Sequence, residues 1–346
     1  MTYKPFSPDE LTVRDSFING RGMSVDLYQT PITPKENMLR LYEGKTPMWI
    51  PHPNEMMSLK IDCDPENVAR SQTGGIDGFG VEWVWEGLGA MVRPGSPKVP
   101  DINEWEKYIT VPNPDDWDWE RCYMQNKGKI RPDLVTHIGF GSCLFERLIA
   151  VMDFAPAAVA LIDEEQQEAV HRFFRAVTDY RLRYYELCKQ WFPVDILNFN
   201  DDWGGQYAPF FSVDTAKEML VPYVKESIDK VHELHCYADL HCCGLVEPFV
   251  PFFIEEGFNS WGGQPLNDKP KLKRMYGDRM IFTHEMAVTD DSSEEEISAA
   301  AARFMEEFGY DNRGLNGTKS EKFRKKLYEL SRKNFDRLVA EGKAIL

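Results

Sequence analysis

Short apolar runs along the chain alternate with longer amphipathic stretches. Between several runs, apolar residues recur at the i, i+3, i+4, i+7 spacing of one helix face, as in residues 211–234. Strands that alternate with helices are typical of a parallel sheet, and eight such units favour an α/β fold closed into a single (β/α)8 TIM barrel. The candidate strands are 48–50, 78–84, 137–140, 196–199, 238–242, 259–261, 280–283 and 310–315.

The chain is expected to consist of an N-terminal arm and one barrel domain. Residues 1–31 show no sustained apolar period, whereas Thr33, Pro34 and Glu36 indicate the capped start of a helix over 34–44. No internal repeat or long linker interrupts residues 32–346, which we assign to the barrel. Further helices are predicted over 163–191, 211–234, 293–308 and 320–339.

The charge balance narrows the classes of binding partner. The 346 residues include 40 Lys and Arg against 56 Asp and Glu, a formal charge of -16, so nucleic acids and anionic membranes would be repelled. The longest apolar stretch, 148–162, is interrupted by Asp153 and Pro156 and is shorter than the ~20 residues of a membrane span. Residues 1–13 contain charged residues where a signal peptide would have an apolar segment. We therefore expect a cytoplasmic protein.

One cysteine pair stands out from the rest. Seven cysteines are an odd number without framework spacing, which indicates reduced thiols. Cys242 and Cys243 directly follow His241 at the end of a predicted strand, where residues 241 and 243 would share one side and Cys242 the other. An imidazole and a thiolate so placed can bind zinc together with a third ligand. The alternative is that these cysteines are small buried apolar residues and His241 a hydrogen-bonded one.

Polar side chains also gather at the end of the strand predicted over 196–199. Asn200, Asp202 and Gln206 follow that apolar run, a composition that suits a ligand-binding loop and is costly in a core. We take these three side chains as candidate substrate-binding groups. The alternative is a solvated loop in which Asp202 binds its own turn.

Two further strand ends carry candidate proton donors. Glu82 lies next to Trp83 in 78–86, so we expect a poorly solvated carboxyl with a raised pKa that acts as a general acid, with Trp83 as a substrate-binding group. His284 closes the run 280–283 and is the second candidate. The alternative for Glu82 is an exposed position. The chain contains no P-loop, GxGxxG, GxSxG or HExxH motif.

Three segments form a recognisable set. Residues 33–51 read as a helix and a strand, 200–206 precede a helix that ends in Pro222-Tyr223, and 241–257 contain H-x-C-G followed by P-x-x-x-x-x-I-E-x-G. Together they resemble the uroporphyrinogen decarboxylase superfamily over most of residues 33–340. The resemblance implies a (β/α)8 barrel.

Within that superfamily, the resemblance points to the corrinoid-dependent methyltransferases. Porphyrinogen decarboxylases carry arginines where this chain has 51–57, which contains none. In the methyltransferase branch the His and Cys of H-x-C bind zinc, which implies zinc on His241 and Cys243. Methanogen members add a cysteine near the last strand, but no cysteine follows Cys243 here, so Glu82 is our candidate third ligand. The chain is then similar to the methyltransferase components of bacterial veratrol or vanillate O-demethylases.

This resemblance implies transfer of a methyl group from an aryl methyl ether to reduced cobalt in a separate corrinoid protein. A phenolate leaves poorly, with a pKa of about 10 by analogy with tyrosine, so Glu82 or His284 would protonate it or zinc would bind it. We expect Glu82 to be needed for methyl transfer. The alternatives are a corrinoid-to-thiol methyltransferase, a non-catalytic corrinoid-binding member, and a cofactor-independent decarboxylase. The last would clamp its acid with Arg93, Arg147 or Arg313.

Overall fold

The computed structural model describes residues 4–20, 22–87, 89–95 and 97–345. The chain folds into two compact units, each assembled from separated segments. Unit 1 comprises Met1–Ser58, Lys129–His137 and Asn259–Leu346. Unit 2 comprises Leu59–Gly128 and Ile138–Phe258.

Unit 1 begins with an antiparallel hairpin and continues with parallel strands and helices. The hairpin, β1 with β2, pairs Val13 with Tyr28 and lies within the expected N-terminal arm. The β10 and β11 strands pair in parallel, as do β11 and β12. The elements are η1 (Pro8–Leu11), β1 (Val13–Ile18), β2 (Ser24–Tyr28), α1 (Pro34–Tyr42), η2 (Pro53–Glu55), β3 (Met56–Leu59), β7 (Val135–Ile138), β10 (Ser260–Trp261), α10 (Lys269–Tyr276), β11 (Ile281–His284), α11 (Glu294–Glu307), β12 (Leu315–Asn316) and α12 (Glu321–Ala340), with the last residues of β3 and β7 belonging to unit 2.

The first helix of unit 1 begins as predicted, but the strand expected after it is absent. The Thr33 side chain accepts the Glu36 backbone N–H, which confirms the cap. Residues 48–50 form no strand, because side chains take their backbone groups: Met48 N–H donates to Asn37 Oδ1 (2.7 Å) and Ile50 N–H donates to Ser331 Oγ (3.2 Å). The strand lies further along the chain, at β3.

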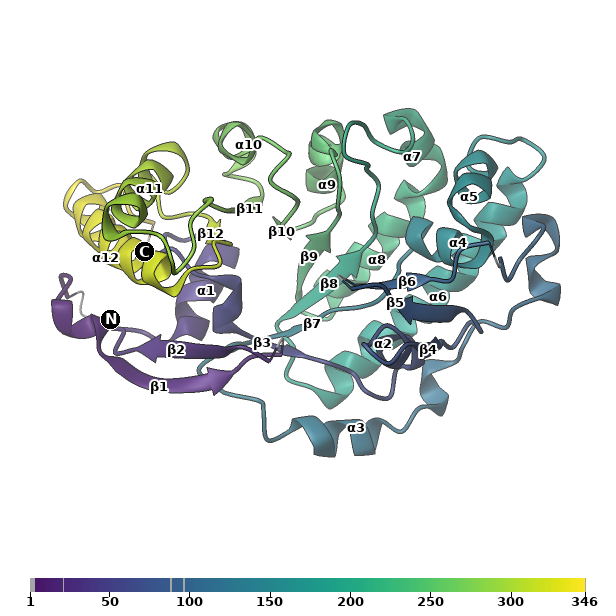
Figure 1. Ribbon diagram of the computed structural model, residues 1–346, viewed down its shortest axis with the longest axis horizontal. Helices are drawn as coiled ribbons and strands as arrows, with labels where there is room; N and C mark the ends of the chain where they lie inside the picture. Colours follow the sequence, from purple (N-terminus) through teal and green to yellow (C-terminus); the bar gives the residue numbers. More distant parts are fainter. Residues whose placement is uncertain (1–3, 21, 88, 96, 346) are drawn as a thin grey trace. The chain divides into compact units, whose positions relative to one another are not determined.

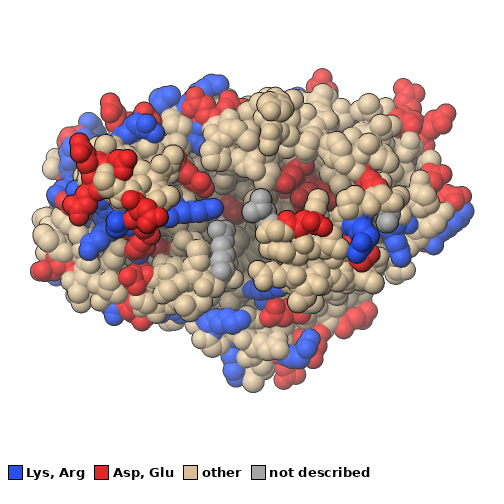
Figure 2. Space-filling model, viewed as in Figure 1, with Lys and Arg blue, Asp and Glu red and all other residues tan. Residues whose placement is uncertain are grey.

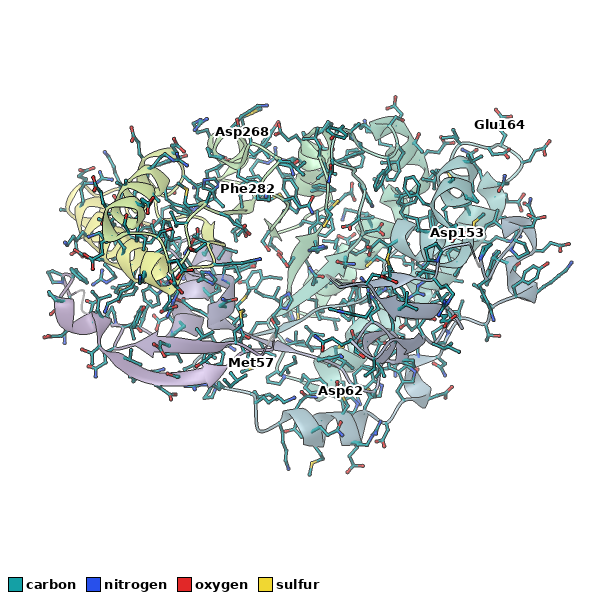
Figure 3. All side chains as sticks on the ribbon, viewed as in Figure 1. Met57, Asp62, Asp153, Glu164, Asp268 and Phe282 are labelled. Carbon is teal, nitrogen blue, oxygen red and sulfur yellow. The ribbon has the colours of Figure 1, made fainter. Side chains whose placement is uncertain are left out.

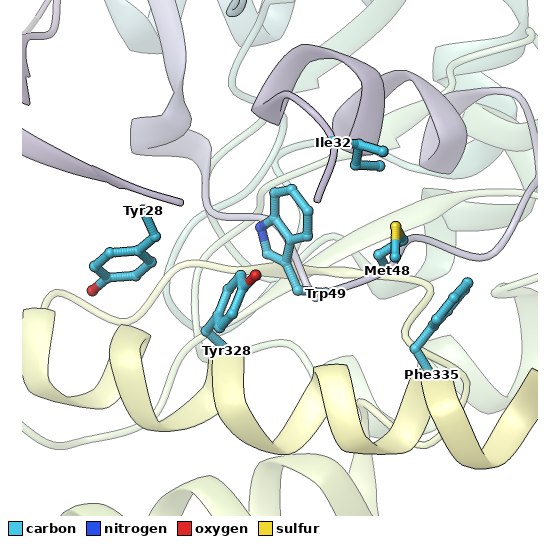
Figure 4. Packing of buried hydrophobic residues seen from close by; sticks show 6 residues of the cluster. All are labelled: Tyr28, Ile32, Met48, Trp49, Tyr328 and Phe335. Carbon is cyan, nitrogen blue, oxygen red and sulfur yellow. The ribbon is translucent and has the colours of Figure 1, made fainter. Parts of the chain in front are cut away.

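Segment 48–50 is instead part of an apolar core in unit 1. Trp49 packs against Tyr328 of α12 with ring centroids 5.4 Å apart, and Tyr28 meets the same ring edge-on at 5.7 Å (Figure 4). Ile32, Met48 and Phe335 complete the buried cluster. Burial of these aromatic rings contributes to the hydrophobic stabilisation of unit 1.

Unit 2 holds one parallel strand pair surrounded by helices. Its strands β8 and β9 pair in parallel from Ile196 opposite Tyr237 to Asn200 opposite His241, and α8 packs beside β9 (Figure 1). The elements are α2 (Pro65–Ala69), β4 (Gly75–Ile76), β5 (Glu82–Trp85), β6 (Ala90–Val92), η3 (Ile102–Lys107), η4 (Pro114–Asp116), α3 (Trp119–Asn126), α4 (Phe145–Met152), α5 (Phe154–Ala160), α6 (Gln167–Trp191), β8 (Ile196–Asn200), α7 (Val213–Met219), α8 (Val221–Glu233), β9 (Tyr237–His241), η5 (Glu247–Phe249) and α9 (Val250–Glu255).

The expectation of a closed eight-stranded barrel is corrected by the strand order. Among the described residues the large sheet has seven strands in the order β12-β11-β10-β9-β8-β7-β3 and does not close. The run 78–84, expected to be a barrel strand, contributes β5 to a separate antiparallel sheet, β4-β5-β6. In β5, Trp83 is buried while Glu82 and Trp85 are exposed, so this short strand is buried at one residue and otherwise lies near the surface. The α/β class and the parallel pairing are confirmed.

The predicted helices are present, with one division. The helix expected over 211–234 is split into α7 and α8, because Pro222 lies in the first turn of α8 and cannot continue the hydrogen bonding of α7. The stretches 163–191, 293–308 and 320–339 correspond to α6, α11 and α12. In the described part of the chain, none of the helices is both long and apolar enough to cross a membrane.

The charged side chains are mixed on the surface. On the face drawn in Figure 2, Asp and Glu are interspersed with Lys and Arg. Acidic and basic side chains also form ion pairs at the surface, such as Arg183 with Asp115.

Arg147 of α4 is the centre of a buried ion network in unit 2. Its Nη1 lies 2.6 Å from Asp77 Oδ2 and its Nη2 lies 2.5 Å from Glu66 Oε2. Glu66 also accepts the Ser142 backbone N–H (2.6 Å), and Asp77 accepts the Trp83 indole N–H (2.9 Å). One guanidinium therefore ties α2, the turn before β5 and the start of α4 together.

We predict that Arg147→Met strongly destabilises the fold. The substitution removes the guanidinium shared by two buried carboxylates and leaves Asp77 with hydrogen bonds alone and Glu66 with the longer Arg70 pair (3.4 Å), so we expect a loss of roughly 3 to 5 kcal/mol in the free energy of unfolding, measured by urea denaturation. The matched control is Arg93→Met, which breaks an exposed, solvent-screened pair with Glu82 and should leave the free energy of unfolding nearly unchanged. Equal losses in the two variants would contradict the role given to the network.

Candidate functional site

The candidate site forms where β8 and β9 end side by side. Because the two strands are parallel and Asn200 is opposite His241, the residues that follow both strands meet at the same edge. Asp202 comes two residues after β8, His241 is the last residue of β9, and Cys243 comes two residues later. All three side chains belong to unit 2.

These three side chains converge. Cys243 Sγ lies 3.3 Å from His241 Nε2, and His241 Nε2 lies 3.8 Å from Asp202 Oδ1. Within the described residues this is the one set of at least three His, Cys, Asp or Glu whose ligand atoms all lie within 4.8 Å of one another. Cys242 is buried on the other side, where its Sγ accepts the Trp203 backbone N–H (3.4 Å). The predicted alternation of residues 241, 242 and 243 is therefore confirmed.

A close approach of two glycines holds the two strand ends together. Gly244 has a φ of +87°, and a Cβ placed on it would lie 2.0 Å from the carbonyl carbon of Gly204. On either side of this contact the backbone is hydrogen-bonded: Cys243 N–H donates to Asp202 Oδ1 (2.6 Å) and Leu245 N–H donates to the Gly205 carbonyl (2.8 Å). Only glycine fits both the positive φ and the missing space.

Asp201 links the strand end to α4. Its carboxylate accepts the backbone N–H groups of Phe145 (3.1 Å) and Glu146 (2.8 Å) in the first turn of α4, together with the Trp203 indole N–H (2.8 Å). Burial raises the pKa of this carboxyl to about 6, while the hydrogen bonds favour its charged form. Asp201 therefore acts as the cap of α4 and fixes the position of Glu146.

Glu146 is a site residue that the sequence pattern did not indicate. Its Oε2 accepts a hydrogen bond of 2.5 Å from Asn200 Nδ2. Burial raises the pKa of Glu146 to about 8, and the negative charges of Asp202 and Asp201 act in the same direction. The carboxyl is thus mainly protonated at neutral pH. In sequence Glu146 is simply an acidic residue in the first turn of an amphipathic helix, which is the usual place for a solvated one.

The set of Asp202, His241 and Cys243 matches the chemistry of a zinc ligand set. Burial raises the pKa of the Cys243 thiol to about 12, and the charge of Asp202 adds to this, so a cation at this place would relieve the repulsion between the two anionic forms. Oxygen, nitrogen and sulfur are all zinc ligands, and three protein ligands are typical of a catalytic zinc site. The third ligand offered is Asp202, which we had assigned to substrate binding, and not Glu82.

The structure corrects the expected surroundings of Glu82 and Trp83. The Glu82 side chain is 51% exposed, and both its oxygens accept hydrogen bonds of 3.0 Å from Arg93, so the expectation of a poorly solvated carboxyl was wrong. Trp83 is 5% exposed, donates to Asp77 and lies under the Arg70 guanidinium at 4.7 Å. A substrate could contact Trp83 only if this packing opened. Gln206 is exposed in the loop after β8.

His284 belongs to unit 1, at the end of β11. Its ring packs on Phe304 and Phe308, with centroids 5.4 and 5.1 Å apart. Burial lowers the pKa of His284 to about 4, so the imidazole is neutral at pH 7. A neutral imidazole is a poor proton donor to a leaving phenolate.

Two of the three arginines named for the decarboxylase alternative, Arg93 and Arg147, are engaged elsewhere. Arg147 is fully buried between Glu66 and Asp77, and Arg93 is paired with Glu82. Neither guanidinium is therefore placed as a free clamp for a substrate carboxylate.

The fold resembles that of one solved methyltransferase. A methyltransferase from Methanosarcina mazei aligns with a TM-score of 0.59 at 14% identity, over 88% of this chain and 99% of that chain. A D-psicose 3-epimerase solved in the presence of D-fructose (TM-score 0.33, 9% identity, 66% and 84% covered) and an endo-1,4-beta-xylanase from Caldicellulosiruptor owensensis (0.31, 10%, 60% and 73%) are too distant to support an argument. No protein-family model and no curated protein matches the chain. At 14% identity the likeness establishes the fold alone.

We predict that Gly244→Ala separates the site residues. The added Cβ clashes with the Gly204 backbone at a positive φ, so the variant should lose more than about 2 kcal/mol in the free energy of unfolding, measured by denaturant titration. Gly87→Ala is the matched control, since Gly87 also has a positive φ but nothing lies within 4 Å of its Cβ position. A Gly244→Ala loss no larger than that of the control would contradict the close approach.

Proposed function

We propose that this chain is a methyltransferase that moves a methyl group from an aryl methyl ether to the reduced cobalt of a corrinoid carried by a partner protein. The observation that carries the proposal is the convergence of Asp202, His241 and Cys243 at the strand ends of a fold similar to that of a methyltransferase. The H-x-C-G segment, which resembles the zinc-binding turn of the corrinoid-dependent branch, supplies two of the three residues.

Asp202, His241 and Cys243 would hold a zinc ion. Zinc bound there would act as a Lewis acid on the ether oxygen and lower the cost of releasing a phenolate. The chain's own contribution is to fix the donors before the ion binds: the Cys243 backbone N–H orients Asp202, and the Gly204–Gly244 contact fixes the distance between the two loops. A set of donors already in place binds an ion without the cost of ordering them.

Glu146 would supply the proton that the departing phenolate needs. Its carboxyl is protonated at neutral pH, feels the charge of Asp202, and is oriented by Asn200. A phenolate with a pKa of about 10 accepts a proton readily from such an acid. Glu146 thereby takes the role first expected of Glu82, and Asn200 becomes a positioning residue.

We predict that zinc binding depends on the three clustered side chains. After incubation with zinc and dialysis, the wild-type protein should retain about one zinc per chain by elemental analysis. His241→Ala and Cys243→Ser should each weaken zinc binding by more than about tenfold. Glu82→Gln, which changes an exposed side chain, is the control and should bind zinc normally. Loss of zinc in the control, or its retention in both cluster variants, would contradict the proposed ligand set.

We predict that Glu146→Gln slows methyl transfer and stabilises the fold at alkaline pH. Formation of methylated corrinoid, followed by absorbance with a panel of methoxyarenes, should slow by roughly 10²- to 10⁴-fold. Between pH 4.5 and about 8 the folded Glu146 keeps a proton that the unfolded chain releases, so this carboxyl lowers stability as the pH rises. The Tm gain of Glu146→Gln should therefore be larger at pH 8 than at pH 5.

The matched variant for this experiment is Glu82→Gln. It removes a carboxyl of the same chemistry from an exposed ion pair and should leave methyl transfer near the wild-type rate. A slow Glu82→Gln with a normal Glu146→Gln would return the acid role to Glu82. A wild-type protein that methylates no corrinoid from any methoxyarene, but transfers methyl groups from corrinoid to a thiol, would replace the proposed direction of transfer.

A further inference from the structure

Arg70 of unit 2 is a partly exposed arginine that the proposed reaction does not use. It directly follows α2, and its Nη1 donates to Ser142 Oγ (3.1 Å), in the segment that leads into α4. Figure 3 labels Asp62 in the turn before α2 and Asp153 directly after α4, which locates the two helices that Arg70 connects.

The contact with Ser142 brings Arg70 to the segment that carries the proposed acid. In segment 142–146, the residue after Ser142 donates its backbone N–H to the Asn200 carbonyl (2.8 Å), and Glu146 accepts a hydrogen bond from the Asn200 side chain (2.5 Å). The charge of Arg70 agrees with this placement: burial raises the pKa of Glu146, and the Arg70 guanidinium acts against that rise.

The Arg70 guanidinium leaves one of its edges unused. In the described part of the chain, both hydrogen bonds of this side chain come from Nη1, so Nε and Nη2 have no hydrogen-bond partner. Its central carbon lies 4.7 Å from the ring centre of Trp83, a contact that orients the group. Arg93 shows what the same edge can do, since its Nε and Nη2 each donate at 3.0 Å to the carboxylate of Glu82.

The charge of Arg70 is only partly compensated. Its partner Glu66 lies 3.4 Å away, whereas the same carboxylate lies 2.5 Å from Arg147 and accepts the Ser142 backbone N–H at 2.6 Å. Glu146 keeps its proton at neutral pH and so adds no negative charge. The Arg70 side chain is 27% exposed, which leaves it accessible to a ligand. A weakly paired cation beside a ligand site favours an anionic group.

We propose that Arg70 binds a carboxylate on the ring of the methyl donor, so that the preferred substrate is an anionic methoxybenzoate and not an uncharged methoxyarene. Nε and Nη2 would donate to the two carboxylate oxygens, because the planar guanidinium edge matches the spacing of those oxygens. This inference rests on the proposed function, since it names the substrate class of the same site. Arg70 is a binding residue here and takes no part in bond making.

A structural role of Arg70 alone would have a different consequence. Loss of packing on Trp83 or of the bond to Ser142 would weaken the binding of every ligand in the site by a similar factor. Loss of a carboxylate contact weakens the binding of anionic ligands alone. A charged and an uncharged ligand of the same shape therefore separate the two roles.

The test is isothermal titration of the full-length protein with para-methoxybenzoate and with its neutral analogue para-methoxybenzamide. Wild-type protein should bind the acid roughly 10- to 100-fold more tightly than the amide. Arg70→Met should remove this preference by weakening binding of the acid, with little change for the amide. Arg172→Met, which removes an exposed arginine paired with Glu106 on α6, is the control and should keep the preference. The preference should also persist with a chelator present, since a metal ion can itself bind a carboxylate.

Three results would overturn the role of Arg70. These are equal affinities of the wild-type protein for the acid and the amide, a preference for the acid that survives Arg70→Met, and a preference that the chelator abolishes. A thermal melt of each variant verifies that folded protein is titrated. If Arg70→Met does not fold, Arg70→Gln, which keeps a hydrogen-bond donor but no charge, replaces it with the same expectation.

Failure of the proposed function gives a distinct result. Methyl transfer to corrinoid from uncharged methoxyarenes, without any preference for the acid, would support the proposed function and reject the role of Arg70. Binding of the acid through Arg70, followed by release of carbon dioxide and no methylated corrinoid, would reject the proposed function and retain the carboxylate contact.

Discussion

The close approach of Gly204 and Gly244 is the contact on which the candidate site depends. Parallel pairing of β8 with β9 brings the two strand ends to one edge, but it leaves the loops after them free to diverge. They do not diverge, because two residues without side chains let the backbones touch, with hydrogen bonds on either side. The distance between Asp202 and Cys243 is therefore set by backbone packing and not by the side chains themselves. A site held in this way is ordered before any ligand arrives.

More acidic side chains lie around this contact than a buried region usually contains. Burial raises the pKa values of Asp201 and Glu146, and the nearby charge of Asp202 raises both further. The cost of placing each carboxyl group here is reduced in a different way. Backbone N–H groups donate to Asp201, and Glu146 keeps its proton. Asp202 lies next to two other side chains with which it can share a cation. Environments that push neighbouring carboxyl groups to different protonation states are typical of catalytic sites. The carboxylates of the buried Arg147 network are paired and have a structural role, whereas those at the strand ends are the ones to which we assign chemistry.

Sequence patterns predicted the parts of this site that depend on local periodicity. Period-two alternation at a strand end placed His241 and Cys243 together, and the apolar runs located β8 and β9 to within a residue. The patterns failed where a distant partner decides the outcome. Segment 48–50 is no strand because Asn37 and Ser331 take its backbone groups, and 78–84 belongs to an antiparallel sheet. Glu146 could not be found because its burial, which raises the pKa of its carboxyl, and its contact with Asn200 depend on segments more than fifty positions away.

The proposed function requires that Asp202, His241 and Cys243 bind a single metal ion through one oxygen, one nitrogen and one sulfur ligand. X-ray absorption spectroscopy at the zinc edge of the zinc-loaded protein tests this directly, because it counts sulfur neighbours separately from nitrogen and oxygen. We expect one sulfur at about 2.3 Å and the remaining ligands at about 2.0 to 2.2 Å. A zinc ion with no sulfur neighbour, or with two or more, would contradict it.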